Sequence, residues 1–280
     1  MKTNHAIESV IDPKFLPPVA LWEAVEKLLP RPRRRHSKGG RPAIANQVIF
    51  FAIFYVLRTG IQWKALPRTL GAGSTIHRHF QKWVQKGIFK KLWRVGLHIY
   101  DEEIGINWEW QAMDGAMTKA PLGGENTGPN PTDRAKAGTK RHLLSDGNGV
   151  PLSVVVTGAN RNDFKETKNV IKNIATKRPV VTARKKQNLC LDKGYDYPEV
   201  HEIVADYHYT GHIRSRGEER NAKKRVPGYR ARRWVVERTH SWMNRFRRLL
   251  IRWEKKVANY EAMLHLACAY ITFRAILVLG

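Results

Sequence analysis

Three carboxylates in this chain stand where a metal-dependent reaction would need them. Asp114 follows a segment of alternating apolar and polar residues that starts near Ile106, and Asp192 follows the short apolar segment 188–191. Both patterns are typical of β-strands, and strand ends in a mixed α/β sheet border the edge where ligands bind. Glu237 lies in a helical segment after the fifth predicted strand, which can pack across that edge. Together the three acids would form an oxygen-ligand site for hard divalent cations.

Each acid also has an ordinary explanation. An Asp that precedes a Gly, as at 114–115, is usually a turn former, and Asp146 in the sequence D-G-N-G is an example of that class. Position alone does not single out the three acids, because the same half of the chain contains other aspartates, namely Asp133, Asp163 and Asp196.

Glu237 is the one acid in the strongly basic segment from Arg230 to Arg252, which contains eight arginines. Apolar residues recur on one predicted helical face of this segment, at Val236, Met243, Phe246 and Leu250. Glu237 either pairs with Arg233 or Arg238 at helical spacing, which contributes a few tenths of a kcal/mol, or it holds a divalent metal whose charge attracts phosphate. The segment alone favours the ion pair.

The overall charge points to a polyanionic partner. The 280 residues include 50 Lys and Arg against 24 Asp and Glu, a formal charge of +26 that opposes compaction unless an anion neutralises it. Nucleic acid fits better than an anionic membrane, because the basic residues are spread over the whole chain. The N-terminus lacks the apolar segment of a signal peptide, and the apolar segments 48–57 and 263–279 are best interpreted as buried helices.

The two cysteines, Cys190 and Cys268, form neither a metal-ligand spacing nor a disulfide framework, which favours a reducing cytoplasm. A cytoplasmic protein with this excess of positive charge is expected to associate with nucleic acid.

The first part of the chain is predicted to be helical. Helices are expected at 19–29, 46–58, 75–85 and 87–100, the third of them with Ser74 as its N-cap. A Gly-containing turn and an exposed basic helix suggest a helix-turn-helix-like unit, in which Arg78 and Lys82 point away from the core toward DNA. The basic segment 31–41 is either a solvated connector or an arm that follows a DNA backbone. We place the boundary of this helical DNA-binding domain at residue 104.

From residue 106 the pattern changes from helical to strand-like. Strands are expected near 106–115, 138–145, 150–157, 188–191 and 209–214, with the D-G-N-G turn joining the second and third. Helices are expected at 163–176, 197–207, 230–252 and from about 260 onward. The fold class predicted for 105–280 is therefore α/β, with a mixed five-stranded sheet flanked by helices.

Several blocks resemble bacterial insertion-sequence transposases of the DDE class, specifically the insertion-sequence-five family. They are Y-V-L-R-T-G-I-Q-W-K-A-L-P (55–67), W-Q-A-M-D-G (110–115), S-D-G-N-G-V-P-L (145–152), T-G-A-N-R-N-D (157–163), L-C-L-D-K-G-Y (189–195) and R-W-V-V-E-R-T-H-S-W-M-N-R-F-R-R-L (233–249). The resemblance extends over roughly residues 40 to 275. It implies an RNase H-like catalytic domain whose catalytic and metal-binding acids are Asp114, Asp192 and Glu237.

The chain departs from the wider group's tyrosine–arginine–glutamate–lysine signature at two places. Arg233 and Glu237 match, whereas the tyrosine place is Arg230 and the lysine place is Asn244, which is followed by Arg245. These two departures affect residues that are expected to bind the flanking phosphates. They do not affect the three acids.

The resemblance implies a DNA transposase that cuts the ends of its insertion sequence and joins the 3'-hydroxyl ends to target DNA. Two Mg2+ ions, for which Mn2+ can substitute, would be held by the three acids, with Asp114 between them. The expected phosphate-binding residues are Lys193, Arg233, Arg238 and Arg245. Trp234 and Trp242 are expected in the core, with stacking on unpaired bases as the second interpretation.

A dimer or larger assembly on double-stranded DNA is implied by the resemblance, because both ends of an element must be handled together. Two alternatives stay open: a catalytically silent DNA-binding regulator of this fold, and a structure-specific nuclease that cuts without joining.

Overall fold

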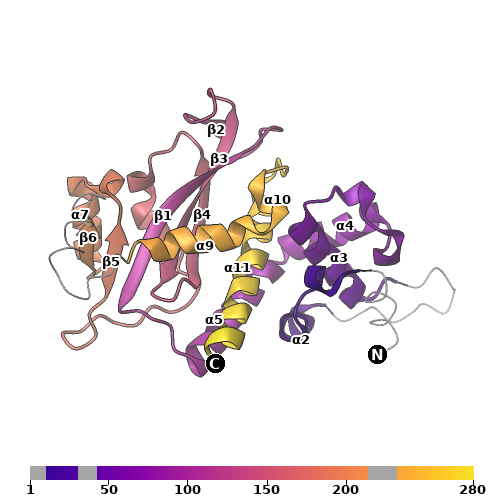
Figure 1. Cartoon of the computed structure of the whole chain (residues 1–280), viewed down its shortest axis with the longest axis horizontal. Coiled ribbons are helices and arrows are strands. Elements are labelled where there is room, and N and C mark those ends of the chain that lie inside the picture. The colour runs from indigo at the N-terminus through magenta and orange to yellow at the C-terminus, as the bar shows by residue number, and fades with distance from the viewer. Residues whose placement is uncertain (1–10, 31–42, 214–231) are drawn as a thin grey trace.

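The computed structural model describes residues 11–30, 43–213 and 232–280. The molecule is elongated, with a group of helices from the first part of the chain at one end and a twisted β-sheet at the other (Figure 1). The basic segment 31–41 and the signature position Arg230 lie outside the described residues.

In the described residues of the first part of the chain there are four α-helices: α2 (Val19–Leu28), α3 (Asn46–Thr59), α4 (Gly73–Gln85) and α5 (Ile88–Glu103). The predicted helices are thus confirmed to within a few residues. α3 is apolar on nearly every side and is buried from Ile49 to Leu57, as expected of a helix at the centre of a bundle. Gly60 ends α3 with φ 71°, a left-handed conformation that glycine adopts without strain.

The start of α4 differs from the prediction. The helix begins at Gly73, with Ala72 as N-cap, so Ser74 lies inside the first turn and does not cap it. The Gly73 Cα sits so close to the chain at Trp63 that an added Cβ would lie 1.8 Å from the Trp63 carbonyl oxygen, and this close packing fixes where the helix starts. The connection from α3 to α4 contains two short 3-10 turns, η2 (Trp63–Ala65) and η3 (Arg68–Leu70).

The sheet has the predicted five strands and one short addition. The strands are β1 (Trp110–Lys119), β3 (Ala137–Asp146), β4 (Pro151–Gly158), β5 (Asn188–Leu191) and β6 (Thr210–Ile213). β3 pairs antiparallel with β1 and β4, while β5 pairs parallel with β1 and β6. The addition is β2 (Gly128–Pro129), which pairs with β3 inside a segment predicted as loop. The predicted mixed α/β class is confirmed.

Asp146 acts as the expected turn former between β3 and β4. Its Oδ1 accepts hydrogen bonds from the backbone N–H groups of Asn148 and Val150, at 3.0 and 2.8 Å. Its Oδ2 accepts from the Tyr100 hydroxyl on α5 and from the backbone N–H of Asn107. One buried carboxylate therefore closes the hairpin and joins it to α5.

Helices cover the sheet: η4 (Asp163–Glu166) leading into α6 (Thr167–Lys172), α7 (Pro198–Asp206), α9 (Trp234–Asn244), α10 (Arg247–Leu250) and α11 (Val257–Leu279), with the turn η5 (Lys193–Tyr195) after β5. α9 crosses the face of the sheet and α11 lies beside α5 (Figure 1).

Two helix predictions need correction. The helix expected at 163–176 is a 3-10 turn followed by a short α-helix that ends at Lys172. The basic segment 230–252 is not one helix, because α9 ends at Asn244 and the extended residue Phe246 separates it from α10. The chain turns there, so Phe246 is buried while Leu250, expected on the same face, is 47% exposed.

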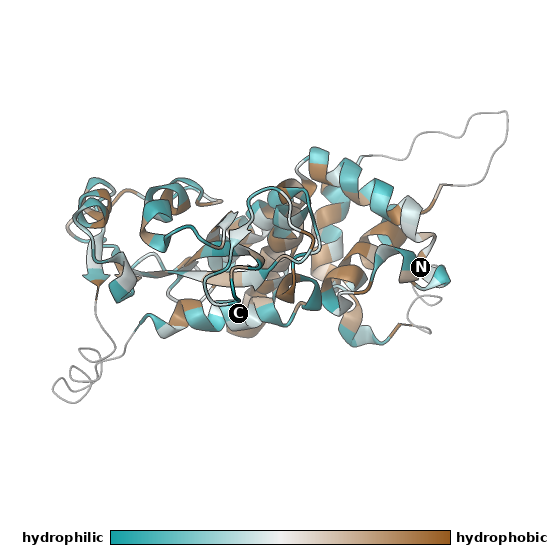
Figure 2. Cartoon of the chain, turned by 90° about the horizontal axis from the view of Figure 1, so that it is seen from above, coloured by the Kyte–Doolittle hydropathy of each residue, from teal (hydrophilic) through white to brown (hydrophobic). Residues whose placement is uncertain are grey.

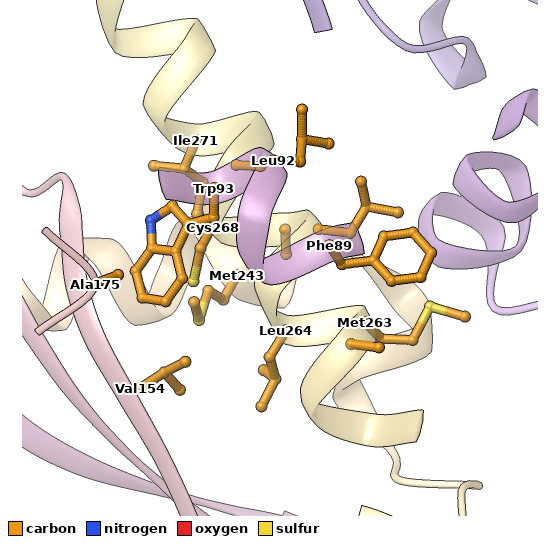
Figure 3. Close-up of a cluster of buried hydrophobic side chains, with 14 of the residues drawn as sticks. Phe89, Leu92, Trp93, Val154, Ala175, Met243, Met263, Leu264, Cys268 and Ile271 are labelled. Carbon is orange, nitrogen blue, oxygen red and sulfur yellow. The ribbon is translucent and has the colours of Figure 1, made fainter. Parts of the chain in front are cut away.

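The two parts of the molecule share one continuous apolar core. Phe89, Leu92 and Trp93 of α5 pack against Leu264 and Cys268 of α11 (Figure 3). Hydrophobic residues gather toward the middle of the molecule and hydrophilic ones occupy the outer turns (Figure 2). The proposed division at residue 104 stays a prediction. α5 packs against α11, which follows the sheet in the chain, as well as against α2 and α4 of the first part.

α11 is, by length and composition, the one helix in the described ranges that could cross a membrane. Its residues from Tyr260 to Phe273 are mostly buried against the rest of the protein. The predicted burial of the segment from 263 is confirmed up to Phe273, while Arg274 and the end of the helix are largely exposed.

Candidate catalytic site

Asp114 does not end its strand, because β1 continues to Lys119 with β3 as partner. What ends near Asp114 is the pairing with β5, whose last pair with β1 is Ala112 with Cys190. Continuing this parallel register by two residues brings Asp114 opposite Asp192. The prediction that Asp114 ends its strand is therefore wrong, because β1 continues beyond it, whereas Asp192 does directly follow the end of β5.

Each aspartate has one carboxylate oxygen held by a backbone amide. Asp192 is the N-cap of η5, and its Oδ1 accepts a hydrogen bond of 2.9 Å from the Gly194 N–H. The Asp114 Oδ1 accepts from the N–H of Gly115 at 2.8 Å. In the described parts of the chain, the second oxygen of each group accepts no hydrogen bond, so an oxygen of each is available to a ligand.

α9 carries Glu237 across the same region. Its buried residues, which include Val236, Thr239, His240 and Met243, face the sheet. Glu237 lies on the other side of the helix with its side chain 51% exposed. Its Oε1 is 4.0 Å from Nη2 of Arg233 one turn earlier, which is the outer limit for an ion pair. Such a pair contributes little, and it leaves the carboxylate accessible.

Asp114 has its pKa raised to about 6. Burial is the largest cause, because it disfavours the charged carboxylate, and the hydrogen bond from Gly115 acts in the opposite direction. Three further acids raise the pKa through their negative charge: Asp192, Asp163 and Glu237. Each of these three acids therefore lies close enough to Asp114 for its negative charge to raise the pKa of Asp114.

The acids do not form a closed cage. Over the described ranges, no group of three or more His, Cys, Asp or Glu side chains is close enough to surround a single ion. Like charges without a cation repel each other, and an exposed Glu237 is free to adopt other rotamers. The arrangement is a set of facing carboxylates on separate elements.

Asp163, which sequence reasoning did not select, is the fourth acid. Its Oδ2 lies 3.1 Å from Lys140 Nζ, and its Oδ1 lies 3.2 Å from His142 Nδ1. Burial raises the pKa of Asp163, but hydrogen bonding to His142 and the charge of Lys140 outweigh it and lower the pKa overall. Asp163 covers Gly115, where an added Cβ would lie 1.9 Å from its Oδ1.

Tyr195 and His240 also lie beside the acids. The Tyr195 hydroxyl is buried and has no hydrogen-bond partner within the described chain. Its pKa is raised by burial and by the charges of Asp163, Asp114 and Asp192. The ring of His240 contacts the backbone at Asp114, and burial lowers the pKa of His240 to about 3, so it is neutral. Tyr195 is the last residue of the L-C-L-D-K-G-Y block, and this position, three residues after Asp192, is the sequence feature that could have indicated that it lies near the acids.

The comparison with known proteins identifies the family of this chain. A family model described as "Transposase DDE domain" matches residues 111–272, more than half of the chain, and "Putative transposase of IS4/5 family (DUF4096)" matches residues 19–93. The chain belongs to the DDE transposases of insertion sequences. It is thus an enzyme, a DNA transposase, and enzymes of this class use divalent metal ions.

Two relatives from Burkholderia cepacia are similar to this transposase. "Putative transposase for insertion sequence element IS402" is 36% identical over 156 residues, which are 55% of this chain and 72% of the relative. "Insertion element IS402 uncharacterized 16.2 kDa protein" is 32% identical over 114 residues, 40% of this chain and 78% of the relative. A solved structure, "Crystal structure of the Mos1 mariner paired end complex with Mn", is 9% identical with a TM-score of 0.29, covering 98% of this chain and 92% of its own.

The predicted DNA-binding residues of the transposase differ in exposure and in their contacts within the protein. Arg78 and Lys82 on α4 are exposed to solvent, as expected. Lys193 forms an ion pair with Asp196, three residues later in the same turn. Arg238 is partly buried and donates a hydrogen bond of 2.6 Å to the Asn148 carbonyl. Their roles toward DNA stay predictions.

Two other arginines of the basic segment have structural roles in the transposase. Arg248 is buried and pairs with Glu254 at 2.7 Å. Arg252 is fully buried and donates to carbonyl oxygens of Glu254 and Asn126 and to the Thr139 hydroxyl. Not all of the positive charge in this segment is therefore available to phosphate.

Proposed function

We propose that Asp114, Asp192 and Glu237 are the catalytic acids and that together they hold two Mg2+ ions, for which Mn2+ can substitute. The observation that carries this proposal is the parallel register of β1 and β5, which brings Asp114 opposite Asp192, while α9 crosses the sheet with Glu237 on its exposed side. The charges of Asp192 and Glu237 also raise the pKa of Asp114. Facing carboxylates destabilise each other unless cations lie between them. Divalent ions would turn this repulsion into attraction for DNA phosphate.

The chemistry of the donors fits magnesium. Carboxylate oxygens are the ligands that hard divalent cations prefer, and Asp114 and Asp192 each keep one oxygen uncommitted by the backbone. If two ions are bound, Asp114 would be the acid that they share. Asp192 would complete one ion's ligands and Glu237 the other's.

When bound, the metals supply an activated oxygen nucleophile and stabilise charge on the phosphodiester, first for cutting at the element's end and then for joining the 3'-hydroxyl to target DNA. The chain's own part is positioning. The Gly115 and Gly194 amides fix one oxygen of each aspartate, so that the other oxygens point in set directions. Lys193, Arg233, Arg238 and Arg245 are the proposed phosphate-binding residues around the acids.

The helical part of the chain is proposed as the domain that recognises DNA, with residues 1–104 on one side of the boundary and the catalytic residues 105–280 on the other. Arg78 and Lys82 on α4 would contact the backbone of the element's terminal repeats. We propose assembly as a dimer or larger oligomer on DNA, and action in the bacterial cytoplasm at the nucleoid, where the substrate is.

The test incubates the full chain with Mg2+ and a labelled duplex that carries the terminal repeat of its own element. Nicked and joined products support the proposed reaction. Nicking without joining identifies a structure-specific nuclease, and a mobility shift without cutting identifies a regulator; either result contradicts the proposal.

Asp192→Ala tests the assignment of the acids. We expect it to abolish cutting and joining, because the carboxylate is needed to hold metal. DNA binding should be retained, because the basic residues that bind phosphate are unchanged. Asp206→Ala, which removes an exposed aspartate at the end of α7, is the matched control and should cut normally. Cutting by Asp192→Ala would show that another acid, such as Asp163, occupies the role.

A further inference from the structure

The middle of α9 is attached to the turn between β3 and β4. Arg238 Nη2 donates a hydrogen bond of 2.6 Å to the Asn148 carbonyl, and the hydroxyl of the next residue, Thr239, donates one of 2.8 Å to the next carbonyl, that of Gly149. Gly149 has φ 88°, and a Cβ added there would lie only 3.2 Å from the Thr239 hydroxyl. Glycine therefore permits both the turn and the close approach of the helix. We call the contact between Thr239 and Gly149 the turn anchor.

The turn that receives α9 is itself held on two sides. Asp146 accepts hydrogen bonds from the backbone N–H groups of Asn148 and Val150, which closes the hairpin. The Tyr100 hydroxyl on α5 donates to Asp146 and accepts a hydrogen bond of 2.9 Å from Nδ2 of Asn148. The carbonyl groups that α9 uses thus have a fixed position relative to both the sheet and α5.

The end of α9 is attached to β3 by a buried arginine. Nη2 of Arg141 donates a hydrogen bond of 2.6 Å to Oδ1 of Asn244. Over the described ranges, Nε and Nη1 of Arg141 have no hydrogen-bond partner, and no carboxylate pairs with the guanidinium. A buried cation with so few partners depends strongly on each of them. We call this hydrogen bond the arginine anchor.

The arginine anchor also accounts for a departure noted in the sequence. Asn244 stands at the lysine place of the wider group's signature. A lysine at this position would bring an ammonium group to the Arg141 guanidinium and would offer it no acceptor. The amide of Asn244 supplies the acceptor without adding charge, so the departure at 244 matches its partner on β3.

The two anchors lie on different sides of α9 relative to Glu237. Thr239 is two residues after Glu237 and therefore about 200° around the helix, whereas Asn244 is seven residues after it and lies on nearly the same side, about two turns on. A rotation or tilt of α9 would stretch at least one anchor. Val236 and Met243 also pack in the core, but apolar contacts are not directional and tolerate such movement better than hydrogen bonds do.

Glu237 depends on the orientation of α9. Its side chain is half exposed, and in the described parts of the chain its ion pair is the 4.0 Å contact with Arg233. Because a side chain stands roughly 5 Å from the helix axis, a rotation of α9 by about 20° would shift it by about 2 Å. Magnesium requires oxygen ligands at about 2.0–2.1 Å in nearly octahedral geometry, so such a shift would remove Glu237 from the metal. This step rests on the proposed function, in which Glu237 holds metal.

We propose that Thr239 and Asn244 are positioning residues for Glu237. The turn anchor and the arginine anchor fix the rotation of α9 and thereby the direction in which the Glu237 carboxylate points. In this role neither residue touches metal or DNA, and each acts through the helix that carries the acid.

The first test measures metal binding without cutting. Mn2+ bound by the full chain in the absence of DNA is measured from the loss of the electron paramagnetic resonance spectrum of the free ion. We expect Thr239→Val, which removes the hydroxyl at nearly constant volume, to weaken Mn2+ binding by roughly tenfold. Thr239→Ser keeps the hydroxyl and should bind Mn2+ as the wild type does.

The matched control is Thr272→Val on α11. Thr239 and Thr272 are both fully buried. Each hydroxyl donates to the carbonyl four residues earlier in its own helix, and that of Thr239 also reaches the turn. Thr272→Val therefore removes the same group and the same helical hydrogen bond without removing an anchor, and it should leave Mn2+ binding unchanged. Thermal denaturation of both variants records their loss of stability.

The second test compares cutting of the terminal-repeat duplex in Mg2+ and in Mn2+. Because Mg2+ is strict in its geometry, we expect Thr239→Val to lose roughly tenfold more cutting in Mg2+ than in Mn2+. Asn244→Leu, which removes the acceptor of the arginine anchor at an exposed residue, should show the same selective loss. Both variants should bind the uncut duplex with wild-type affinity when a chelator is present. Thr272→Val should lower the two rates alike.

The outcomes separate this proposal from the proposed function. Wild-type Mn2+ binding and an unchanged ratio of the two cutting rates in both anchor variants overturn it. Equal effects of Thr239→Val and Thr272→Val on Mn2+ binding attribute the loss to stability and also overturn it. If Glu237→Gln is inactive while the anchor variants behave as the wild type, the acid stands and only the positioning is wrong. If Glu237→Gln cuts normally, the assignment of Glu237 fails, and the positioning proposal fails with it.

Discussion

Asp114 is the residue at which burial and like charge act together. Its carboxylate is enclosed by the sheet and α9, and three other acids face it. In the absence of metal this arrangement favours the neutral, protonated form up to about pH 6, whereas an unfolded chain ionises the same group near pH 3.8. Between these values the folded state binds more protons, so folding stability falls as pH rises.

The first prediction concerns this titration. Asp114→Asn cannot ionise, so its stability relative to the wild type should rise with pH in the absence of metal. We expect this relative stability to be greater at about pH 7.5 than at about pH 4.5 by roughly 2 kcal/mol. Denaturant unfolding at both pH values measures the difference. Adding Mg2+ should stabilise the wild type and not the variant. The same pH dependence in both proteins would contradict the idea that Asp114 carries the shifted pKa.

The second prediction concerns Gly115. A Cβ there would lie 1.9 Å from Oδ1 of Asp163, so Gly115→Ala must displace Asp163 from Lys140 and His142. We expect a loss of about 1–3 kcal/mol in the free energy of unfolding and slower cutting of DNA. In an Asp163→Ala background the same substitution should cost less, because the obstructing carboxylate is gone. Equal costs in both backgrounds would locate the strain elsewhere.

At the scale of elements, Arg252 connects segments that are far apart in sequence. Directly after α10, it donates hydrogen bonds to the Glu254 and Asn126 carbonyls at 2.9 and 3.1 Å and to the Thr139 hydroxyl at 3.0 Å. The guanidinium thereby joins the end of the basic segment to β3 and to the loop before β2. Such a fully buried cation requires all of its partners.

The third prediction follows from this network. We expect Arg252→Lys to lower the free energy of unfolding by about 2–5 kcal/mol, because an ammonium group cannot reach all of these acceptors and leaves buried carbonyls unpaired. Arg247→Lys, on the exposed side of α10, is the control and should change stability by less than about 0.5 kcal/mol. Similar thermal denaturation of the two variants would contradict this role.

The sequence was informative where local pattern decides structure. Strand alternation and the D-G-N-G turn predicted the strands of the sheet, and the blocks around Asp114, Asp192 and Glu237 indicated the family. The sequence did not predict the features that depend on tertiary contacts. The break of the basic segment at Phe246 follows from packing of that ring against Tyr270, and the fourth acid Asp163 approaches Gly115 only once the sheet has formed, so spacing along the chain could not indicate either.

At the scale of the whole molecule, the net charge of +26 is only partly available to DNA. Arg248 and Arg252 are buried and stabilise the fold, whereas Arg78 and Lys82 on α4 and Arg245 and Arg247 after α9 are exposed. DNA bound by both the helical part and the acids would therefore contact phosphates over an extended surface, and counterions would be released along it.

The fourth prediction concerns salt. We expect DNA binding to weaken steeply with ionic strength, and Arg78→Ala/Lys82→Ala to reduce the slope of log K against log salt concentration by about 1–2, with a similar loss for all DNA sequences. Anisotropy titrations over a range of salt concentrations measure the slope. An unchanged slope would show that α4 does not contact the backbone, and Arg184→Ala/Lys185→Ala serves as the control for loss of charge elsewhere.

The pairing of α5 with α11 has a consequence for synthesis of the enzyme. α5 leaves the ribosome early, yet its apolar face is covered by residues after Val257, which are made late. Until translation has passed this point, the nascent polypeptide exposes that face and α9 has no support on its α11 side. A chain that ends before residue 257 is therefore expected to expose this apolar face and to aggregate more readily than the full chain.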